Sequence, residues 1–282
     1  MSDHVFVCPP REPLLRALKD KNVVVDAAST KGVADAFGLA QRCGAAVRCV
    51  RARFAGLLAE IKPEAAWEGI PLALYVDGVG RFRDIAPRLP ALRRLNLRVY
   101  VQASSANNLT GIRILSSLGL AAAAIIDRSA DWGGCADLCT YALLGTAPHA
   151  PIDPFARLAE NYHETGINRL TAALFEDPSA IFHVNENGPV ARTAGELARS
   201  EFVAPSIERF LAAPPEPLDS ALGLLAQNSS CAFCPALSVC LGIVADPANC
   251  PPGAKEFFAD LLDAVEQSKD LNRRGRRTLW QT

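Results

Sequence analysis

The chain has 282 residues, half of them hydrophobic, so it is long enough to bury one large core or a large and a small one. Its formal net charge of −1 and pI of about 6.4 provide no overall attraction to nucleic acid or to an anionic membrane. The longest apolar run, Leu118 to Ile126, is too short to cross a bilayer.

No signal peptide is evident in the first ten residues, MSDHVFVCPP, because they lack a basic start and a long apolar stretch. We therefore expect a cytoplasmic protein with neither nucleic-acid nor membrane partners. In that compartment nine cysteines are not expected to form disulfides, so metal ligands and buried core thiols should account for most of them.

Short β-rich runs alternate with helical segments up to about Asp127, which is typical of βα units around a parallel sheet. The predicted strands are Asn22–Ala28, Ala45–Arg51, Pro71–Asp77, Leu97–Ala103 and Ala121–Asp127. The predicted crossover helices are Lys31–Arg42, Phe54–Trp67, Phe82–Leu95 and Asn107–Leu118. These units predict an α/β fold, and five strands favour a partial or complete βα barrel.

Polar residues lie at the ends of four of these strands. They are Asp26, Asp77 and Asp127 on three strands, and Gln102, Ser104 and Ser105 on a fourth. Parallel strands would place them along one rim, where such folds bind ligands. Capping of the next helix or tightening of a turn is the more ordinary role, and we favour it.

The βα rhythm breaks between Asp131 and Pro154, which suggests a domain of residues 1–150 followed by a domain of residues 151–282. In the second part we expect a helix at Phe155–Glu164, a hairpin turning at Asn187-Gly188, and an amphipathic helix at Ala254–Gln267. The end of the chain carries four arginines, which suit either an acidic partner or a solvated terminus, and we favour the latter.

The densest chemical feature is a group of four cysteines within twenty residues, Cys231, Cys234, Cys240 and Cys250. The two-residue gap between the first pair lets both thiolates reach one metal centre, and the longer gaps let the chain wrap around it. Four thiolates suit an iron–sulfur cluster or zinc, and spacing alone leaves both open.

The run Cys231-x2-Cys234-x5-Cys240, preceded by the hairpin FHVNENG at residues 182–188, resembles the SPASM domain. This domain is an auxiliary iron–sulfur module of peptide-modifying radical S-adenosylmethionine (SAM) enzymes. Pro151-Ile-Asp-Pro-Phe155 is similar to the segment that leads into it. By this resemblance, the preceding βα units would form a radical SAM-like barrel.

The chain departs from the SPASM pattern where a further cysteine would follow, because that position is Val244. One [4Fe–4S] cluster is therefore expected, with Cys250 as fourth ligand and Cys135 or Cys139 as alternatives. Cys135 and Cys139 are better explained by core packing, as are Cys8, Cys43 and Cys49. None of the four histidines, His4, His149, His163 and His183, has metalloprotease spacing.

No segment reads Cys-x3-Cys-x2-Cys, the triad that holds the reactive cluster of a radical SAM enzyme. The chain is similar to stand-alone SPASM proteins of the GeoRSP type. That resemblance implies an accessory protein that partners a radical SAM maturase and a ribosomally made peptide or its chaperone, in peptide recognition or electron transfer. The alternative is a βα-barrel enzyme with a structural zinc site and catalysis at Asp26, Asp77 and Asp127.

Overall fold

The computed structural model describes residues 4–162, 170, 175, 177, 179–215, 234, 236–240 and 250–279, apart from the side chains of residues 238 and 272–279. The chain divides into two compact units. Unit 1 comprises Met1–Tyr100 and Leu174–Asp219, and unit 2 comprises Val101–Ala173 and Ser220–Thr282. The division into domains of residues 1–150 and 151–282 stays a prediction.

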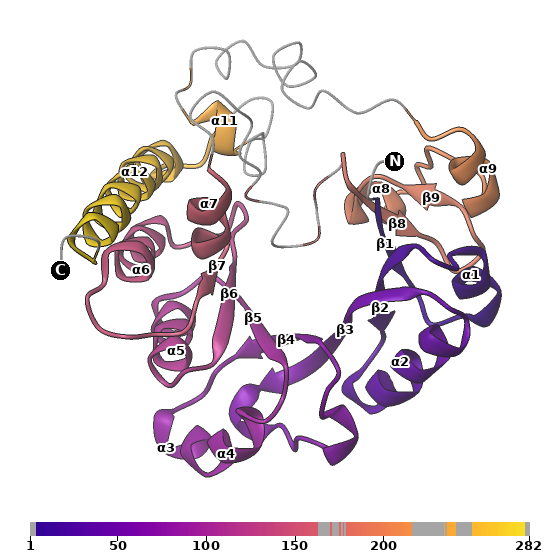
Figure 1. Ribbon diagram of the computed structural model, residues 1–282, viewed down its shortest axis with the longest axis horizontal. Helices are drawn as coiled ribbons and strands as arrows, with labels where there is room; N and C mark the ends of the chain where they lie inside the picture. The colour runs from indigo at the N-terminus through magenta and orange to yellow at the C-terminus, as the bar shows by residue number, and fades with distance from the viewer. Residues whose placement is uncertain are drawn as a thin grey trace. The chain divides into compact units, whose positions relative to one another are not determined.

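The fold is α/β, with a mostly parallel nine-stranded sheet whose strands alternate with helices (Figure 1). The strands are β1 (Val5–Cys8), β2 (Asn22–Ala27), β3 (Ala46–Leu57), β4 (Leu72–Gly78), β5 (Leu97–Gln102), β6 (Ala121–Ile125), β7 (Ile152–Asp153), β8 (Ile181–Val184) and β9 (Val190–Ala191). Their order in the sheet is β7-β6-β5-β4-β3-β2-β1-β8-β9. All five predicted strands are confirmed to within a few residues, except that β3 is longer at its end.

The helices connect and flank these strands. They are α1 (Glu12–Ala17), α2 (Val33–Arg42), α3 (Phe82–Ile85), α4 (Leu89–Leu92), α5 (Ala106–Ser117), α6 (Trp132–Leu144), α7 (Phe155–Asn161), α8 (Ala194–Ala198), α9 (Ile207–Ala212), α11 (Leu237–Cys240) and α12 (Ala254–Leu279). Short 3-10 turns are η1 (Thr30–Gly32), η2 (Leu58–Glu60), η3 (Ala65–Trp67) and η4 (Ala86–Arg88). The predicted helices that became α2, α5 and α7 are confirmed over the described residues. The predicted helix Ala254–Gln267 is confirmed as the first part of α12, which continues to Leu279.

The predicted helix Phe54–Trp67 is wrong. β3 runs on to Leu57, and it pairs with β4 as far as Gly78. The turns η2 and η3 follow on either side of Pro63, which has no N–H to donate within a helix. Pairing with β4 therefore overrides the helical spacing of the apolar residues.

Two prolines divide the predicted helix Phe82–Leu95 into α3, η4 and α4. Pro87 lies in the first turn of η4, and Pro90 lies in the first turn of α4. Proline is tolerated in the first turn of a helix. In the interior it is disfavoured, because its ring collides with the preceding turn. The segment is therefore three short pieces instead of one crossover helix.

In unit 1 the two faces of the sheet differ in character. One face of β2 and β3 is fully buried beside α2, which packs on both strands; its residues are Val23, Val25, Val50 and Ala52. The other face carries Asp26 and Arg51, which are partners in the pairing of β2 with β3. Val24 also alternates onto this second face and is buried in an apolar cluster with Val7 and Ile181, so the second face carries both apolar and charged residues.

The predicted hairpin at Asn187-Gly188 is confirmed. β8 and β9 pair antiparallel, and the Gly188 N–H donates to the Asn185 carbonyl oxygen at 3.0 Å. Gly188 has a φ of +107°, a value that favours glycine. β8 also pairs in parallel with β1, so the hairpin extends the same sheet.

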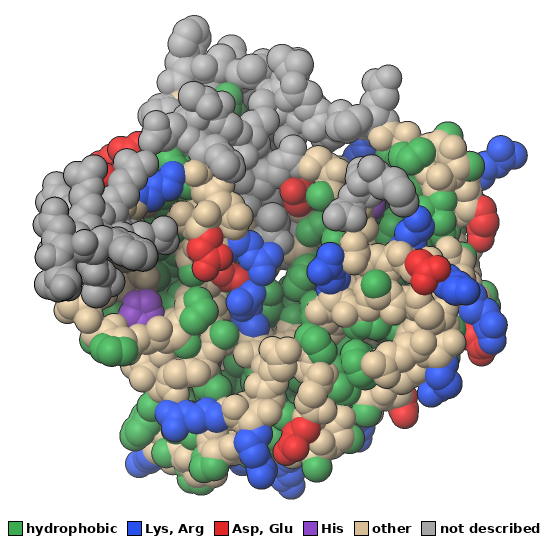
Figure 2. Space-filling view, in the orientation of Figure 1, with side chains coloured by type: hydrophobic (Ala, Val, Ile, Leu, Met, Phe, Trp, Pro, Cys, Tyr) green, Lys and Arg blue, Asp and Glu red, His purple; other side chains and the backbone are tan. Residues whose placement is uncertain are grey.

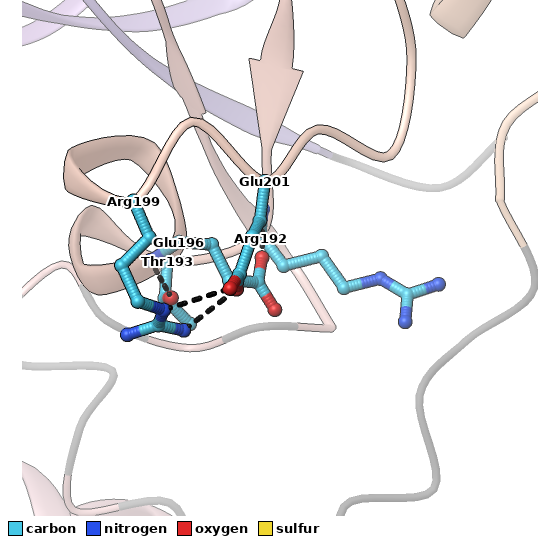
Figure 3. Close-up of polar contacts among 5 residues, drawn as sticks. All are labelled: Arg192, Thr193, Glu196, Arg199 and Glu201. Carbon is cyan, nitrogen blue, oxygen red and sulfur yellow. Dashed lines mark hydrogen bonds and ion pairs between the residues drawn. The ribbon is translucent and has the colours of Figure 1, made fainter.

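Thr193 is the N-cap residue of α8, which follows β9 (Figure 3). The Thr193 hydroxyl accepts from the Glu196 backbone N–H at 3.0 Å, and the Glu196 carboxylate accepts from the Arg192 backbone N–H at 2.8 Å. Beyond the helix, Arg199 donates two hydrogen bonds to the Glu201 carboxylate, at 3.0 and 2.8 Å. These local bonds satisfy the helix start and fix the turn that leaves α8.

In unit 2, α12 packs against α6 and α7. Phe257 and Phe258 are each 1% exposed, and their rings lie 5.6 and 6.2 Å from the ring of Trp132 on α6. Phe155 at the start of α7 contacts Phe257 at 6.3 Å. Aromatic side chains from three helices thus form the core of this part of the unit.

None of the helices in the described part of the chain combines the length and the hydropathy needed to cross a membrane. On the face in Figure 2, basic and acidic side chains are interspersed among apolar and neutral ones. This distribution agrees with the small net charge of the chain.

Candidate metal centre

Cys234 and Cys240 lie at the two ends of a short helical segment. The Leu237 N–H donates to the Cys234 carbonyl oxygen at 3.0 Å, and the Cys240 N–H donates to the Ala236 carbonyl oxygen at 2.8 Å. Ala236 and Val239 are buried, with 2% and 0% of their surface exposed. The apolar side chains therefore anchor α11, while both cysteines stay partly exposed.

Cys250 directly precedes the turn that starts α12. The Ala254 N–H donates to the Pro251 carbonyl oxygen at 3.2 Å, and Gly253 has a φ of +81°. A Cβ at Gly253 would lie 3.2 Å from the Trp132 Cβ, so this turn packs closely on α6. The position of the chain beside Cys250 is therefore fixed by the aromatic core of unit 2.

Burial distinguishes the described cysteines of the predicted metal set from most of the others. The members of the predicted metal set that the structure describes are partly exposed; they are Cys234, Cys240 and Cys250. Four others are buried: Cys8, Cys43, Cys135 and Cys139. Cys49 is partly exposed on β3. Metal ligands need access for loading, whereas packing thiols do not.

The described cysteines are not assembled into a metal site. Within the described residues, no group of three or more histidine, cysteine, aspartate or glutamate side chains could hold a metal ion. Cys231 lies outside the described residues. The arrangement of the complete set of four therefore remains a prediction.

Cys135 and Cys139 lie one turn apart on α6 and are almost wholly buried, at 0% and 2% exposure. Burial raises the pKa of the Cys135 thiol to about 12, and the nearby Asp131 carboxylate adds to the effect. Burial likewise raises the pKa of Cys139 to about 12, with contributions from Asp260 and Cys135. Both side chains thus remain protonated thiols, which supports the core-packing interpretation.

We expect iodoacetamide to modify Cys234 in metal-free protein at neutral pH and to leave Cys135 and Cys139 unmodified. A thiol whose pKa is raised by folding stabilises the fold below its unfolded pKa, near 9, and that stability is lost as pH rises towards 12. Both thiols should therefore react only as the fold weakens in alkali. Mass spectrometry after alkylation across this pH range measures how fast each cysteine is labelled. Equal labelling rates for Cys234, Cys135 and Cys139 at neutral pH would contradict the assignment of Cys135 and Cys139 to the core.

The remaining cysteines occupy the places expected of structural residues. Cys8 ends β1, and burial together with the charge of Asp26 raises its pKa to about 12. Cys43 is the C-terminal cap of α2, and Cys49 lies within β3. These positions agree with the predicted helix Lys31–Arg42 and the predicted strand Ala45–Arg51.

At the strand ends of unit 2, the polar residues form turns and caps. The Asp127 carboxylate accepts from the Gln102 amide at 2.6 Å, and from the Ser129 N–H and hydroxyl at 2.8 and 2.7 Å. The Ser105 hydroxyl accepts from the Asn108 N–H and caps α5. The capping interpretation is confirmed for Asp127 and Ser105.

In unit 1 the rim contains a charged and aromatic row that the sequence analysis missed. Arg51 donates to both oxygens of Asp26, at 2.9 and 2.6 Å, and its guanidinium lies 6.0 Å from the centre of the Tyr75 ring. Tyr75 stacks on Tyr100 at 4.6 Å with an interplanar angle of 11°, and Phe175 lies 5.9 Å from Tyr100. The bidentate pair occupies the Asp26 carboxylate, which does not favour a role for it as a catalytic base.

The residues of this row lie in predicted strands, but their alignment depends on how the strands pair. Arg51 is the last residue of one predicted strand, and Tyr75 and Tyr100 lie two and three residues before the ends of two others. Only the register, in which Asp26 pairs with Arg51 and Arg53 with Tyr75, brings their side chains to one face. Spacing within a single strand does not reveal that alignment.

The described histidines have structural surroundings. His183 is 1% exposed, and its Nε2 lies 3.2 Å from the Phe175 carbonyl oxygen. The Nδ1 of His149 lies 3.0 Å from the Ala150 carbonyl oxygen. Burial lowers the pKa of His4, and the charge of Lys21 lowers it further. His163 lies outside the described residues.

Comparison with known proteins does not assign the chain to a family. No protein-family description, curated protein or solved structure matches this chain.

Proposed function

We propose that Cys231, Cys234, Cys240 and Cys250 hold one [4Fe–4S] cluster. The observation that carries this proposal is the occurrence of four cysteines within twenty residues, at spacings that suit thiolate ligation. All four belong to unit 2. Those that the structure describes are partly exposed, whereas the two cysteines of α6 are buried.

We further infer that the sheet and its helices are a radical SAM-like βα barrel, partial or complete, that leads into a SPASM-like module. The order of β1 to β7 in the sheet follows their order in the chain, as in βα barrels. Helices α2, α5 and α6 separate successive strands, which also supports this assignment.

The function proposed on this basis is that of an accessory protein to a radical SAM peptide maturase. It would recognise a ribosomally made peptide or its chaperone, or transfer electrons to or from the maturase. A cluster held by these four thiolates would supply electron transfer and would leave no open coordination site for a substrate. Because the chain lacks a Cys-x3-Cys-x2-Cys triad, it is not expected to cleave S-adenosylmethionine by itself.

The protein's own part would be to hold α11 and the turn after Cys250 in place for the ligands. Val239 and Ala236 anchor α11, and the contact of Gly253 with Trp132 fixes the turn after Cys250. The core of unit 2 would thus support the ligand segment at the turn that follows Cys250. Such support limits reorganisation of the ligands when a cluster changes its charge.

The test is the metal content of protein purified without oxygen. We expect about four iron atoms and about four sulfides per chain, together with a broad visible absorption band. The Cys231→Ala/Cys234→Ala double variant should lose both iron and sulfide. Iron and sulfide assays, a zinc assay and an absorption spectrum on the same samples give the answer.

The matched control is the Cys43→Ala/Cys49→Ala double variant, which removes the same number of thiols outside the proposed set. It should retain iron and sulfide. Stoichiometric zinc without sulfide would overturn the cluster and leave a structural zinc site. Iron lost equally from both variants would mean that general destabilisation, and not ligand removal, caused the loss.

A further inference from the structure

We propose that the end of β3 in unit 1, residues 53–57, binds an acidic peptide segment that adds to the sheet as an extended strand. These residues include no cysteine, so binding there needs no cluster. The inference deepens the peptide-recognition part of the proposed function and rests on it for the biological source of the peptide. It is carried by an unpaired strand edge, by the fixed course of that edge and by two exposed arginines.

The free edge arises because β3 is longer than β2, the strand beside it (Figure 1). β2 ends at Ala27, whose partner on β3 is Ala52, whereas β3 continues to Leu57. The other side of β3 stays paired with β4, where Leu57 is the partner of Gly78. In the described part of the chain, no strand takes the place of β2 beside residues 53–57. Such an edge presents backbone N–H and C=O groups to which an extended peptide can bind.

The connection that follows β2 does not close this edge. After Ser29, which is exposed, the chain enters η1 and then α2. η1 contacts β3, but the hydrogen bond described for its backbone is internal, from the Gly32 N–H to the Ser29 carbonyl oxygen at 3.3 Å. Three side chains of the edge are exposed, those of Arg53, Ala55 and Leu57. The end of β3 is therefore accessible on the side where β2 is absent.

The end of β3 is held in one conformation by the turn that follows it. The Glu60 carboxylate accepts from the Leu57 N–H at 3.2 Å, so a peptide would bond to backbone groups before Leu57. The Ala59 N–H donates to the Val79 carbonyl oxygen at 3.2 Å. Leu58 and Ala59 are buried, at 0% and 7% exposure. An edge that is already ordered loses little conformational entropy on binding, which favours capture of a short segment.

Exposed arginines and apolar side chains at this edge indicate the kind of segment. Arg53 and Arg81 are exposed, and neither has an acidic partner among the described residues. Arg81 is close to the end of β3, because a Cβ on its neighbour Gly80 would lie 3.8 Å from the Leu57 Cβ. Leu57 and Phe82 are 41% and 52% exposed. This surface matches a segment in which acidic and apolar residues alternate.

The acidic side chains of the same region are already engaged. Glu60 accepts from the backbone of the turn, and the Asp84 carboxylate lies 3.7 Å from the Arg83 Nε. Asp77, at the end of β4, also has an interaction within the chain. They leave the two arginines to an external anion. Charges on an exposed edge can also serve only to prevent aggregation, so the experiment must separate protection from binding.

The probe is a fluorescein-labelled peptide of alternating glutamate and valine, and it is titrated with the full-length protein at low salt. We expect saturable binding in fluorescence anisotropy that weakens as salt is added. Hydrogen–deuterium exchange of residues 53–57 should slow when the peptide is bound. A version with every backbone amide N-methylated keeps the side chains and charges but has no N–H to donate, so it should not bind.

Arg53→Ala/Arg81→Ala should bind the peptide about tenfold more weakly, because it removes two ion pairs with the glutamates. The matched control removes two other exposed arginines, Arg42 at the end of α2 and Arg48 near the start of β3, and should bind like the parent protein. The Cys231→Ala/Cys234→Ala variant should also bind like the parent. The peptide titration and the iron assay can therefore fail independently of each other.

Four results would overturn the proposal. Equal binding of the N-methylated peptide would exclude strand addition. Equal binding of a version with glutamine in place of glutamate would exclude selection of an acidic segment, and equal weakening in the matched control would exclude a local role for the two arginines. Absence of peptide binding, with aggregation of Arg53→Ala/Arg81→Ala, would mean that these arginines only protect the edge.

Discussion

Replacing Cys250 with serine is expected to lower the iron content of anaerobically purified protein and to change its visible spectrum. A serine hydroxyl keeps its proton at neutral pH and so replaces a thiolate poorly as an iron ligand. The substitution should leave the fold intact, because Cys250 is partly exposed and precedes α12. Iron analysis and absorption spectroscopy on the variant, with circular dichroism to verify folding, measure the effect.

The same measurements on variants of the two α6 cysteines identify the fourth ligand. Cys135→Ala and Cys139→Ala should each retain the iron and sulfide of the parent protein, because both thiols are buried and protonated in the metal-free fold. An unchanged spectrum in Cys250→Ser would remove that residue from the ligand set. Loss of iron in Cys135→Ala or Cys139→Ala, with folding retained, would transfer the fourth position to α6.

The strands were predictable because each carries its own signal. β2, β4, β5 and β6 are short apolar runs rich in valine, leucine or alanine, and turns bound them on both sides. β1 was missed because its four residues stand beside Pro9 and Pro10, which dominate the local pattern. Its place is fixed by long-range pairing, since it lies between β2 and β8.

The helices were predictable only where apolar spacing and backbone chemistry agree. In α2 the buried residues Val33, Ala36 and Ala40 recur at helical intervals with no proline among them. In the segment after β3, similar spacing was overridden by pairing with β4 and by Pro63. A proline inside a periodic run should therefore divide the predicted helix, as it does at Pro87 and Pro90.

The candidate site shows a comparable limit. The spacing of Cys231, Cys234, Cys240 and Cys250 indicates soft-metal chemistry, because thiolates close in sequence can reach one centre. Spacing carries no information on burial, which distinguishes Cys234, Cys240 and Cys250 from Cys135 and Cys139. It also gives none on cross-strand pairs such as Asp26 with Arg51, whose alignment depends on the register of β2 and β3.

Two substitutions on α12 test whether its halves differ as the structure implies. Phe257→Ala should lower the free energy of unfolding by about 3–5 kcal/mol, because the ring is 1% exposed and contacts Trp132, Phe155 and Phe258. Leu271→Ala, on the same stripe of the same helix, should change it by less than about 0.5 kcal/mol, because that side chain is 57% exposed.

Urea unfolding followed by circular dichroism and by tryptophan fluorescence measures both values, and coincident transitions are required for the comparison. Trp132 reports directly on the contact that Phe257 loses. A large loss in Leu271→Ala would mean that the side chain of Leu271 is packed within the protein. A small decrease in the free energy of unfolding of Phe257→Ala would instead mean that the aromatic core contributes little to the stability of α12. It would also contradict our inference that this core fixes the turn beside Cys250.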